Sequence, residues 1–385
     1  MVIRNGTVIE PGKGERIADV FIDDQTGIVT DVPCGGEVID ATGMYVAPGF
    51  IDTHIHGSFG ADTSDGSLEK IITMCERLPE FGVAAFCPTT MTESESVIDS
   101  ALHAVCEARK LPGRGGALIL GVHLEGPFMS PEMAGVQDAA SCISPADAAP
   151  VIDRFESRYP GLIRIIDVAP ELEGGIDLIR LMADRYVMSL AHTSAGYDKA
   201  IEAFDAGATS VTHILNAMNA MGKRSPGVPG AVFDRNDVFV EMICDGIHIA
   251  PPIIRMMFKM IPEDRMIVIS DAMRGAGMPD GIYKLAEADV EVRGGRTYYG
   301  PEGGLAGSVT NLAQEAARLY SYGIDRELII KAMTVNPLRR LGIDPCETGL
   351  GTLMPGKARS VNILDDELHL VYSAVDGVLR KAFRE

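Results

Sequence analysis

Positive charge is scarce in this sequence of 385 residues, in which 34 lysines and arginines stand against 54 aspartates and glutamates. The resulting net charge of −20 repels nucleic acid and anionic lipid, and no basic patch offsets it. Long hydrophobic runs are also absent, since no stretch approaches the ~18 apolar residues that a membrane helix requires. Residues 1–6 lead into strand-like sequence rather than into the apolar region of a signal peptide. These absences exclude polyanion binding and membrane spanning as main functions, and we expect a cytoplasmic protein.

Cysteine and histidine are sparse as well. The seven cysteines are odd in number, widely scattered and never arranged as C-x-x-C, which excludes a disulfide framework and a thiolate zinc site. We interpret the cysteines as small buried hydrophobic residues. Because the chain has only eight histidines, the position of each one carries information.

Apolar and β-branched runs alternate with amphipathic stretches between residues 50 and 275, which indicates repeated βα units and a parallel sheet. The number of strand candidates and their spacing of about 20–45 residues favour a (β/α)8 TIM-like barrel over an open doubly wound sheet. A G-x-G-x-x-G loop after the first strand is missing, which also argues against the doubly wound alternative. The eight strand candidates end near His56, Pro88, Glu125, Asp167, His192, His213, Cys244 and Asp271.

The two ends of the sequence have a different character. Residues 1–47 read as short strands separated by turns, and residues 360–375 alternate as a strand pair around Asp365 and Asp366. Since neither end could bury a sheet alone, we expect the two ends to meet in one small sheet structure. The predicted α/β architecture therefore has a small β-sandwich domain of residues 1–48 and 345–385, a barrel domain of residues 49–344, and a β-hairpin insertion near residues 282–303.

His54 and His56 stand two positions apart at the end of the first predicted barrel strand. In a strand, residues i and i+2 point to the same side, so both imidazoles can reach a single metal ion at the mouth of the barrel. An H-x-H motif alone is equally compatible with two core or surface histidines. The motif therefore needs support from other parts of the chain.

That support comes from four further side chains that end predicted strands. Catalytic groups of this fold gather at the C-terminal ends of the strands. A single glutamate before Gly-Pro would be an ordinary surface carboxylate, but several metal-binding side chains on one rim favour a metal centre. Nitrogen and oxygen ligands without thiolate suit Zn²⁺ or Fe²⁺ with an open position for water. The four residues are Glu125, His192, His213 and Asp271.

The chain resembles the amidohydrolase superfamily and, within it, the family of N-acetylglucosamine-6-phosphate deacetylases. The matching segments follow one another in family order over nearly the whole chain. The motifs His123-Leu124-Glu125-Gly126-Pro127 and Asn216-Ala217-Met218 are specific to the deacetylase branch, whereas H-x-H is shared across the superfamily. The segments are residues 48–57, 123–128, 191–193, 212–218, 245–248, 270–273 and 305–308.

The resemblance implies a metal centre with one or two ions of Zn or Fe per subunit. Glu125, His192 and His213 match the ligands of the main metal ion. His54 and His56 match the ligands of a second ion beside it. Glu125 would take the bridging role that a carboxylated lysine has in other amidohydrolases.

The resemblance also assigns catalytic and substrate-binding positions. Asp271 matches the catalytic carboxylate. The loop around Arg224 is rich in glycine and proline, which predicts a protruding loop. In the family this arginine reaches a neighbouring subunit's site, which implies at least a homodimer. The positions that match those holding the sugar phosphate are Asn216, Ala217, Arg224 and His248.

This sequence departs from the family pattern at one substrate-binding position. Some members carry a histidine that helps to polarise the acetyl carbonyl, and the aligned residue here is Gln137. A glutamine amide still donates hydrogen bonds, so we include Gln137 among the substrate-binding residues. The departure leaves the acyl preference open.

The function implied is metal-assisted hydrolysis of the N-acetyl amide of N-acetylglucosamine 6-phosphate, giving glucosamine 6-phosphate and acetate. A bound ion lowers the pKa of its water to about 7, and Asp271 would take the water proton and return it to the leaving nitrogen. Two alternatives within the superfamily are deacetylation of N-acetylgalactosamine 6-phosphate and hydrolysis of another amide. A barrel that has lost catalysis and serves as a binding module is disfavoured, because the ligand set has no gap.

Overall fold

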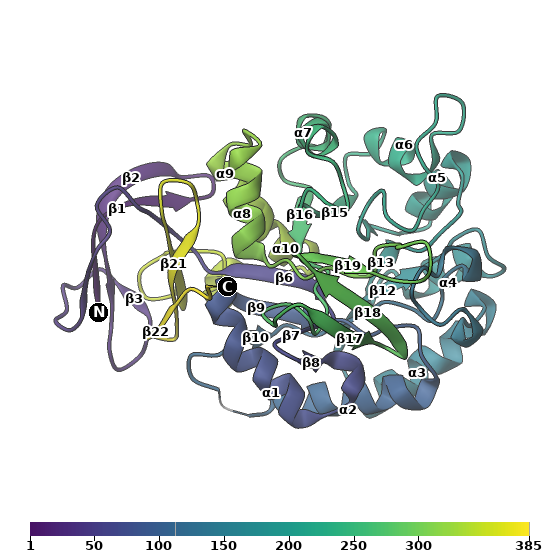
Figure 1. Cartoon of the computed structure of the whole chain (residues 1–385), viewed down its shortest axis with the longest axis horizontal. Coiled ribbons are helices and arrows are strands. Elements are labelled where there is room, and N and C mark those ends of the chain that lie inside the picture. The colour runs from purple at the N-terminus through teal and green to yellow at the C-terminus, as the bar shows by residue number, and fades with distance from the viewer. Residues whose placement is uncertain (112, 385) are drawn as a thin grey trace.

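The computed structural model describes residues 1–111 and 113–384, and Figure 1 shows a small group of strands beside a larger α/β body. Among the described residues, no helix has both the length and the hydropathy of a membrane span. The larger body contains the predicted catalytic segments, and the small group contains strands from both ends of the chain.

The larger body is built on two parallel sheets. One sheet has the order β10-β9-β6, and the other runs from β11 to β16 in chain order. Isolated parallel bridges connect the two sheets, one from Ile55 in β6 to Ala272 after β16 and one from Thr89 after β9 to His123 in β11. The predicted α/β class with parallel strands is therefore confirmed. The strands are β6 (Phe50–Ile55), β9 (Val83–Pro88), β10 (Leu118–Ile119), β11 (Val122–Leu124), β12 (Ile163–Val168), β13 (Val187–Leu190), β14 (Ser210–Val211), β15 (Phe239–Ile243) and β16 (Met266–Ile269).

The third predicted strand is interrupted. It consists of β10 and β11, which belong to different sheets, and Gly121 between them has a φ of +148° that only glycine adopts readily. The sequence of residues 118–122 does not reveal this break. Leu120 and Val122, on either side of Gly121, are both apolar and buried, as in an uninterrupted strand.

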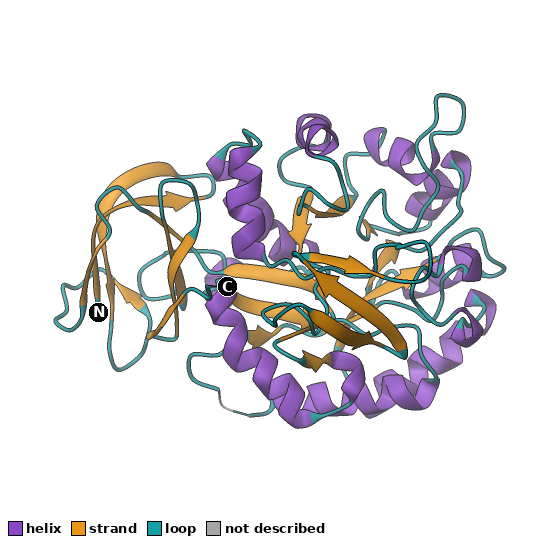
Figure 2. Cartoon of the chain, viewed as in Figure 1, coloured by secondary structure: helices purple, strands orange, loops and turns teal. Residues whose placement is uncertain are grey.

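The helices lie along the outside of these strands, as Figure 2 shows. Their buried residues recur at helical spacing, for example Ile98, Leu102 and Val105 in α2, and pack on the strands in one large core. Side chains cap several of them, including Asn311, which accepts a hydrogen bond from the backbone N–H of Gln314 at the start of α8. The helices are α1 (Leu68–Arg77), α2 (Glu95–Arg109), α3 (Ala148–Arg158), α4 (Gly175–Met182), α5 (Tyr197–Asp205), α6 (Gly227–Phe233), α7 (Pro251–Met260), α8 (Leu312–Ser321), α9 (Arg326–Met333), α10 (Val335–Arg340) and α11 (Pro345–Thr348).

Strands from the two ends of the chain form one sheet with the order β22-β21-β20-β5-β1-β2-β3, and β4 pairs with β1. The two ends meet where β20 pairs antiparallel with β5, with Asn362 opposite Ala47. Ile3 and Val8 from one end share a hydrophobic cluster with Val361 and Ile363 from the other. The strands are β1 (Val2–Glu10), β2 (Gly14–Ile22), β3 (Val29–Thr30), β4 (Val38–Asp40), β5 (Tyr45–Ala47), β20 (Ser360–Leu364), β21 (Leu370–Val375) and β22 (Val378–Lys381).

An antiparallel insertion follows β16. It has three strands, β17 (Gly281–Leu285), β18 (Ala288–Arg293) and β19 (Arg296–Tyr298), one more than a hairpin. Gly294 and Gly295, both with positive φ, make the two-residue turn between β18 and β19. Its apolar face packs against Met91 and Met273, which follow β9 and β16. The insertion therefore lies at the rim where the parallel strands end, as do the short strands β7 (Gly57–Ser58) and β8 (Ala61–Asp62) after β6.

The seven cysteines are all free. Cys87 and Cys244 are buried, but the expectation that every cysteine is buried is wrong. Cys346 in α11 is exposed, and four others are only partly buried.

Candidate active site

The candidate ligands all lie at the C-terminal ends of parallel strands. His54 is in β6 and His56 follows it, and Glu125 comes directly after β11. His192, His213 and Asp271 each come two residues after a strand, namely β13, β14 and β16. All six residues are buried.

Three of these residues have an unusual backbone conformation. The φ angles are +42° at His192, +29° at His213 and +49° at Asp271. A left-handed conformation at a residue other than glycine costs on the order of 1–3 kcal/mol, so surrounding contacts must hold it. At Asp271 the backbone N–H donates to the carbonyl of His54 at 3.0 Å. The strain turns these side chains away from the strand direction and toward a common centre.

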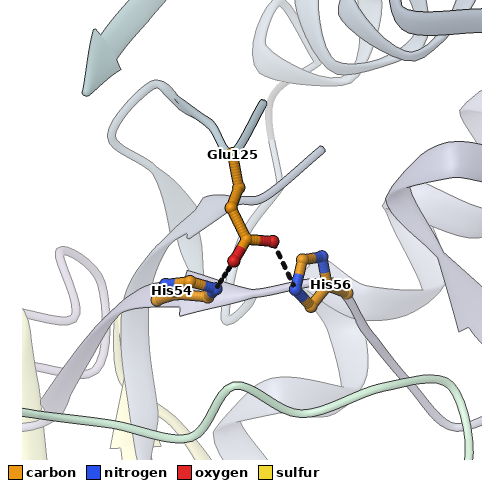
Figure 3. A group of neighbouring side chains, drawn as sticks. All are labelled: His54, His56 and Glu125. Atoms are coloured by element: carbon orange, nitrogen blue, oxygen red, sulfur yellow. Dashed lines mark ion pairs between the residues drawn. The ribbon is translucent and has the colours of Figure 1, made fainter. Parts of the chain in front are cut away.

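Glu125 is that centre. Its Oε1 lies 3.1 Å from Nε2 of His192 and 3.0 Å from Nε2 of His213. Figure 3 shows the carboxylate reaching between the H-x-H histidines, with Oε1 3.6 Å from Nε2 of His54 and Oε2 3.2 Å from Nε2 of His56. One carboxylate thus contacts four imidazoles and bridges two donor groups, Glu125 with His192 and His213, and Glu125 with His54 and His56.

The protonation pattern of the histidines tests whether a cation fits here. His192 Nδ1 lies 2.7 Å from the carbonyl of Met133, and His56 Nδ1 lies 3.3 Å from the carbonyl of Thr89. A carbonyl only accepts, so each Nδ1 carries a hydrogen, and Nε2 is the ring nitrogen that faces Glu125 and is left for a proton or a metal ion. Nε2 atoms this close to a carboxylate require positive charge, which either protons on the rings or a metal ion between the groups can supply. These ligand atoms of Glu125 and the histidines are 3.0–3.6 Å apart, which spans the roughly 3.3 Å expected around a tetrahedral ion with bonds of about 2.0–2.1 Å.

The pKa shifts of His213 and Glu125 also indicate that the cluster attracts positive charge. Burial lowers the pKa of His213, but Glu125 more than compensates and raises it to about 9. Burial raises the pKa of Glu125, but the surrounding histidines hold it well below its usual value. Protons and a metal ion compete for the same Nε2 atoms, so metal affinity should fall in acid.

Asp271 borders both donor groups. Its Oδ1 lies 3.2 Å from Nε2 of His56 and 3.4 Å from Nε2 of His54. Burial raises the pKa of Asp271, but the two histidines lower it below its ordinary value overall. The carboxyl is therefore ionised near neutral pH and can accept a proton.

A cavity of about 330 Å³ opens onto this cluster. Among the predicted substrate-binding residues, Gln137, Asn216, Ala217 and His248 line it together with Glu125 and Asp271. Arg224 lies elsewhere: it is exposed in the loop between β14 and α6 and lines a separate groove with Tyr197 and Asn219.

Gln137 and His248 are held by specific hydrogen bonds. The Gln137 amide nitrogen donates to Glu125 Oε2 at 2.7 Å, and its oxygen accepts from the backbone N–H of Thr92 at 2.6 Å. These two contacts show that the nitrogen end of the Gln137 amide faces Glu125. His248 is oriented by Asp245, whose Oδ2 lies 2.8 Å from Nδ1.

Sequence reasoning missed the apolar wall of the cavity. Met91, Leu285 and Ala306 line it and belong to one hydrophobic cluster. Nothing in the chain marks Met91 as different from the other 18 of its 19 methionines. The Met133 carbonyl that orients His192 was also missed, because a backbone carbonyl has no sequence signature.

Known proteins resemble this chain along almost its whole length. The model of the amidohydrolase family matches residues 45–383. An N-acetylglucosamine-6-phosphate deacetylase of Bacillus subtilis (strain 168) is 34% identical over 349 residues, covering 90% of this chain and 87% of that protein. An N-acetylgalactosamine-6-phosphate deacetylase of Escherichia coli O157:H7 is 32% identical over 369 residues, covering 94% and 93%.

A solved structure of a related protein has a similar fold. It is an aspartate-to-alanine variant of N-acetyl-D-glucosamine-6-phosphate deacetylase from Mycobacterium smegmatis, in complex with N-acetyl-D-glucosamine 6-phosphate. The TM-score is 0.87 at 27% identity, with 98% of each chain covered. The resemblance expected from the sequence motifs is therefore confirmed in sequence and in fold.

Proposed function

Because the chain belongs to the amidohydrolase family, we propose that it hydrolyses the N-acetyl amide of N-acetylglucosamine 6-phosphate to glucosamine 6-phosphate and acetate. The observation that carries the proposal is the Glu125 cluster, in which histidine lone pairs converge on one carboxylate at the floor of a cavity. Proteins similar to this chain carry the names of deacetylases for this substrate class.

The architecture that supports this function is a closed (β/α)8 barrel with a small β-sandwich. The two isolated bridges between the parallel sheets, Ile55 to Ala272 and Thr89 to His123, support ring closure. The hydrophobic cluster shared by β1 and β20 supports one small domain from both ends of the chain. Residues 49–344 would then form the catalytic domain, and residues 1–48 and 345–385 the small domain.

The donor set fits a divalent metal ion, and Zn²⁺ or Fe²⁺ suits its nitrogen and oxygen ligands, with one or two ions per chain. Such an ion, when bound, lowers the pKa of a coordinated water and polarises the acyl oxygen. Glu125, His192 and His213 would hold one ion. His54 and His56 would hold a second ion on the other side of Glu125.

The proton moves through Asp271. Its carboxylate is ionised and borders the donor groups, so it accepts the proton of the attacking water and delivers it to the sugar nitrogen. That delivery is needed because the nitrogen leaves as an amine. The Gln137 amide nitrogen is directed toward the cluster and donates to the acyl oxygen, and Met91, Leu285 and Ala306 face the acyl methyl group.

The phosphate requires local positive charge against a net charge of −20. Asn216, Ala217 and His248 line the cavity, but none is a permanent cation. Arg224 is exposed on a projecting loop and can enter the cavity of another subunit, which makes a homodimer part of the proposal. A cytoplasmic location fits, since a dianionic sugar phosphate crosses lipid bilayers poorly.

One alternative has specific support. The relative from Escherichia coli O157:H7 acts by name on N-acetylgalactosamine 6-phosphate, and its identity to this chain is close to that of the glucosamine enzyme. The two substrates differ only in the configuration at C4.

The deciding experiment measures acetate release from both epimeric 6-phosphates and from unphosphorylated N-acetylglucosamine. We expect the highest kcat/KM with N-acetylglucosamine 6-phosphate, and at least one Zn or Fe per chain in protein prepared without chelator. Full activity in protein that contains no metal would contradict the proposal. A higher kcat/KM for the galactosamine epimer would select the alternative.

A further inference from the structure

The interior of the barrel below the histidines carries buried charges. Barrel interiors of this kind are filled mainly by branched apolar side chains. Here Glu241, from the middle of β15, and Arg340, from the end of α10, have fully buried side chains. Arg340 Nη1 donates to Glu241 Oε1 at 2.5 Å and to Ser210 Oγ at 3.2 Å. The arginine therefore pins one oxygen of the glutamate.

The other oxygen of Glu241 faces a predicted metal ligand. Its Oε2 lies 3.3 Å from Nδ1 of His54. An ionised carboxylate only accepts, so His54 Nδ1 carries the hydrogen and Nε2 carries the lone pair. Among the described residues Nε2 of His54 makes no hydrogen bond, and it points toward Glu125 and Asp271.

We propose that Glu241 is a positioning residue that fixes the tautomer and the ring orientation of His54, and that Arg340 holds Glu241 in place for this role. The inference rests on the proposed metal centre. A histidine that binds metal through Nε2 commonly donates its Nδ1 hydrogen to an acceptor, and removal of such partners typically weakens metal binding about 10–100-fold. Glu241 acts through His54 and has no contact with the reacting atoms.

The neighbouring His123 differs from His54 in the partners of its ring nitrogens. His123 packs against His54 with ring centroids 4.6 Å apart. Its Nε2 lies 3.0 Å from Asp167 Oδ1, and its Nδ1 lies 3.1 Å from the carbonyl of Thr53. Both ring nitrogens of His123 are thus engaged in hydrogen bonds, whereas Nε2 of His54 makes none among the described residues. The buried pair of Asp167 and His123 is a matched control for the pair of Glu241 and His54.

The variant Glu241→Gln should invert the tautomer. The oxygen of a glutamine amide is attracted to Arg340, which leaves the NH₂ group directed at His54 Nδ1. Nδ1 then becomes an acceptor, and the hydrogen moves to Nε2, where it points at the metal ligands. A second variant, Glu241→Asp, keeps the charge for Arg340 but withdraws the carboxylate from His54.

The test uses the full chain labelled with ¹⁵N-histidine. Imidazole ¹H–¹⁵N correlation spectra of metal-free protein report which nitrogen of each histidine carries the hydrogen, and the His54 signal is identified by its loss in His54→Asn. Titration with Zn²⁺ alone reports metal affinity without any substrate. We expect Nδ1–H in the wild type, a shift of the hydrogen toward Nε2 in both Glu241 variants, and Zn²⁺ affinity reduced about 10–100-fold.

Asp167→Asn is expected to leave both the His54 signal and the Zn²⁺ affinity unchanged. If Glu241→Gln does not fold, Glu241→Asp decides the question by the same two measurements. An unchanged His54 tautomer and unchanged Zn²⁺ affinity in a folded Glu241 variant would overturn the inference, as would equal effects in Asp167→Asn. Neither measurement involves the sugar phosphate, so absence of deacetylase activity in the wild type would contradict the proposed function and leave this inference standing.

Discussion

Asp271 combines a strained backbone with a buried carboxyl that remains ionised. Its φ of +49° turns the side chain from the end of β16 toward His56. We predict that Asp271→Asn binds Zn²⁺ and the sugar phosphate nearly as well as the wild type but loses about 10²–10⁴ in kcat, because an amide cannot accept the water proton. Steady-state kinetics with N-acetylglucosamine 6-phosphate give kcat and KM separately. A defect confined to KM would assign Asp271 to substrate binding instead.

At the level of single residues, the sequence indicated which side chains lie together because they end strands. Glu125, His192 and His213 follow apolar runs, and the C-terminal ends of parallel strands converge on one rim. The sequence did not predict a role for Glu241, because it lies within a strand, where a single glutamate usually faces solvent. Only the arrangement in space shows that it is buried and contacts His54 and Arg340.

Helix α8 has an acidic residue on its buried face. Glu315 is fully buried between other core positions of the helix, and neither carboxylate oxygen has a side-chain hydrogen-bond partner among the described residues. Burial raises the pKa of Glu315 well above its ordinary value of 4.5, and the nearby negative charge of Asp245 adds to this effect. The native state therefore holds a proton that the unfolded chain releases at lower pH.

The contribution of Glu315 to the stability of the fold should consequently fall as pH rises. Between pH 4.5 and the raised native pKa, folding takes up a proton at Glu315, so the free energy of unfolding declines by up to about 1.4 kcal/mol per pH unit. Glu315→Gln removes this dependence. We predict that the urea midpoint of the variant, relative to that of the wild type, increases as pH rises above 4.5 toward the raised native pKa. The exposed Glu76→Gln in α1 is the control, and a parallel course of all three proteins would refute the prediction.

At the level of elements, regular periodicity was predictable and interruptions were not. Apolar runs located β6, β9 and β12 to β16 because each contributes buried apolar residues to the core. The break between β10 and β11 depends on the conformation of one glycine, and β17 depends on packing against residues far away in sequence. Such tertiary contacts leave no local pattern.

At the level of the whole molecule, the exposed position of Arg224 bears on whether two subunits share a substrate site. Its side chain is exposed and outside the cavity of its own chain, yet the described residues that line the cavity include no lysine or arginine for a phosphate. Removal of a charge-assisted hydrogen bond costs about 1.5–3 kcal/mol, so Arg224→Ala should raise KM for the phosphorylated sugar and spare the unphosphorylated one. Steady-state kinetics on both sugars check this.

Mixing of subunits then tests whether the arginine is shared. A dimer of one Arg224→Ala chain and one Asp271→Asn chain contains one site with intact Asp271 and a borrowed Arg224. After random exchange of equal amounts, about a quarter of wild-type activity should return. Mixing Asp271→Asn with the Arg224→Ala/Asp271→Asn double variant restores no complete site and serves as the control. If mixed dimers form and remain inactive, Arg224 does not act across the interface.

The joining of both chain ends in one sheet has a consequence for biosynthesis. Thr352 donates a hydrogen bond to Glu10, 342 residues earlier, and β5 pairs with β20. At about 5–20 residues per second, the ribosome needs roughly 20–70 s to make the intervening chain. During that interval one edge of β5 has no partner, and an open strand edge is a template for incorrect pairing. Successive βα units can begin to fold as they emerge, but the terminal sheet is completed only after β20 has been translated, so the nascent chain depends on protection of this edge until then.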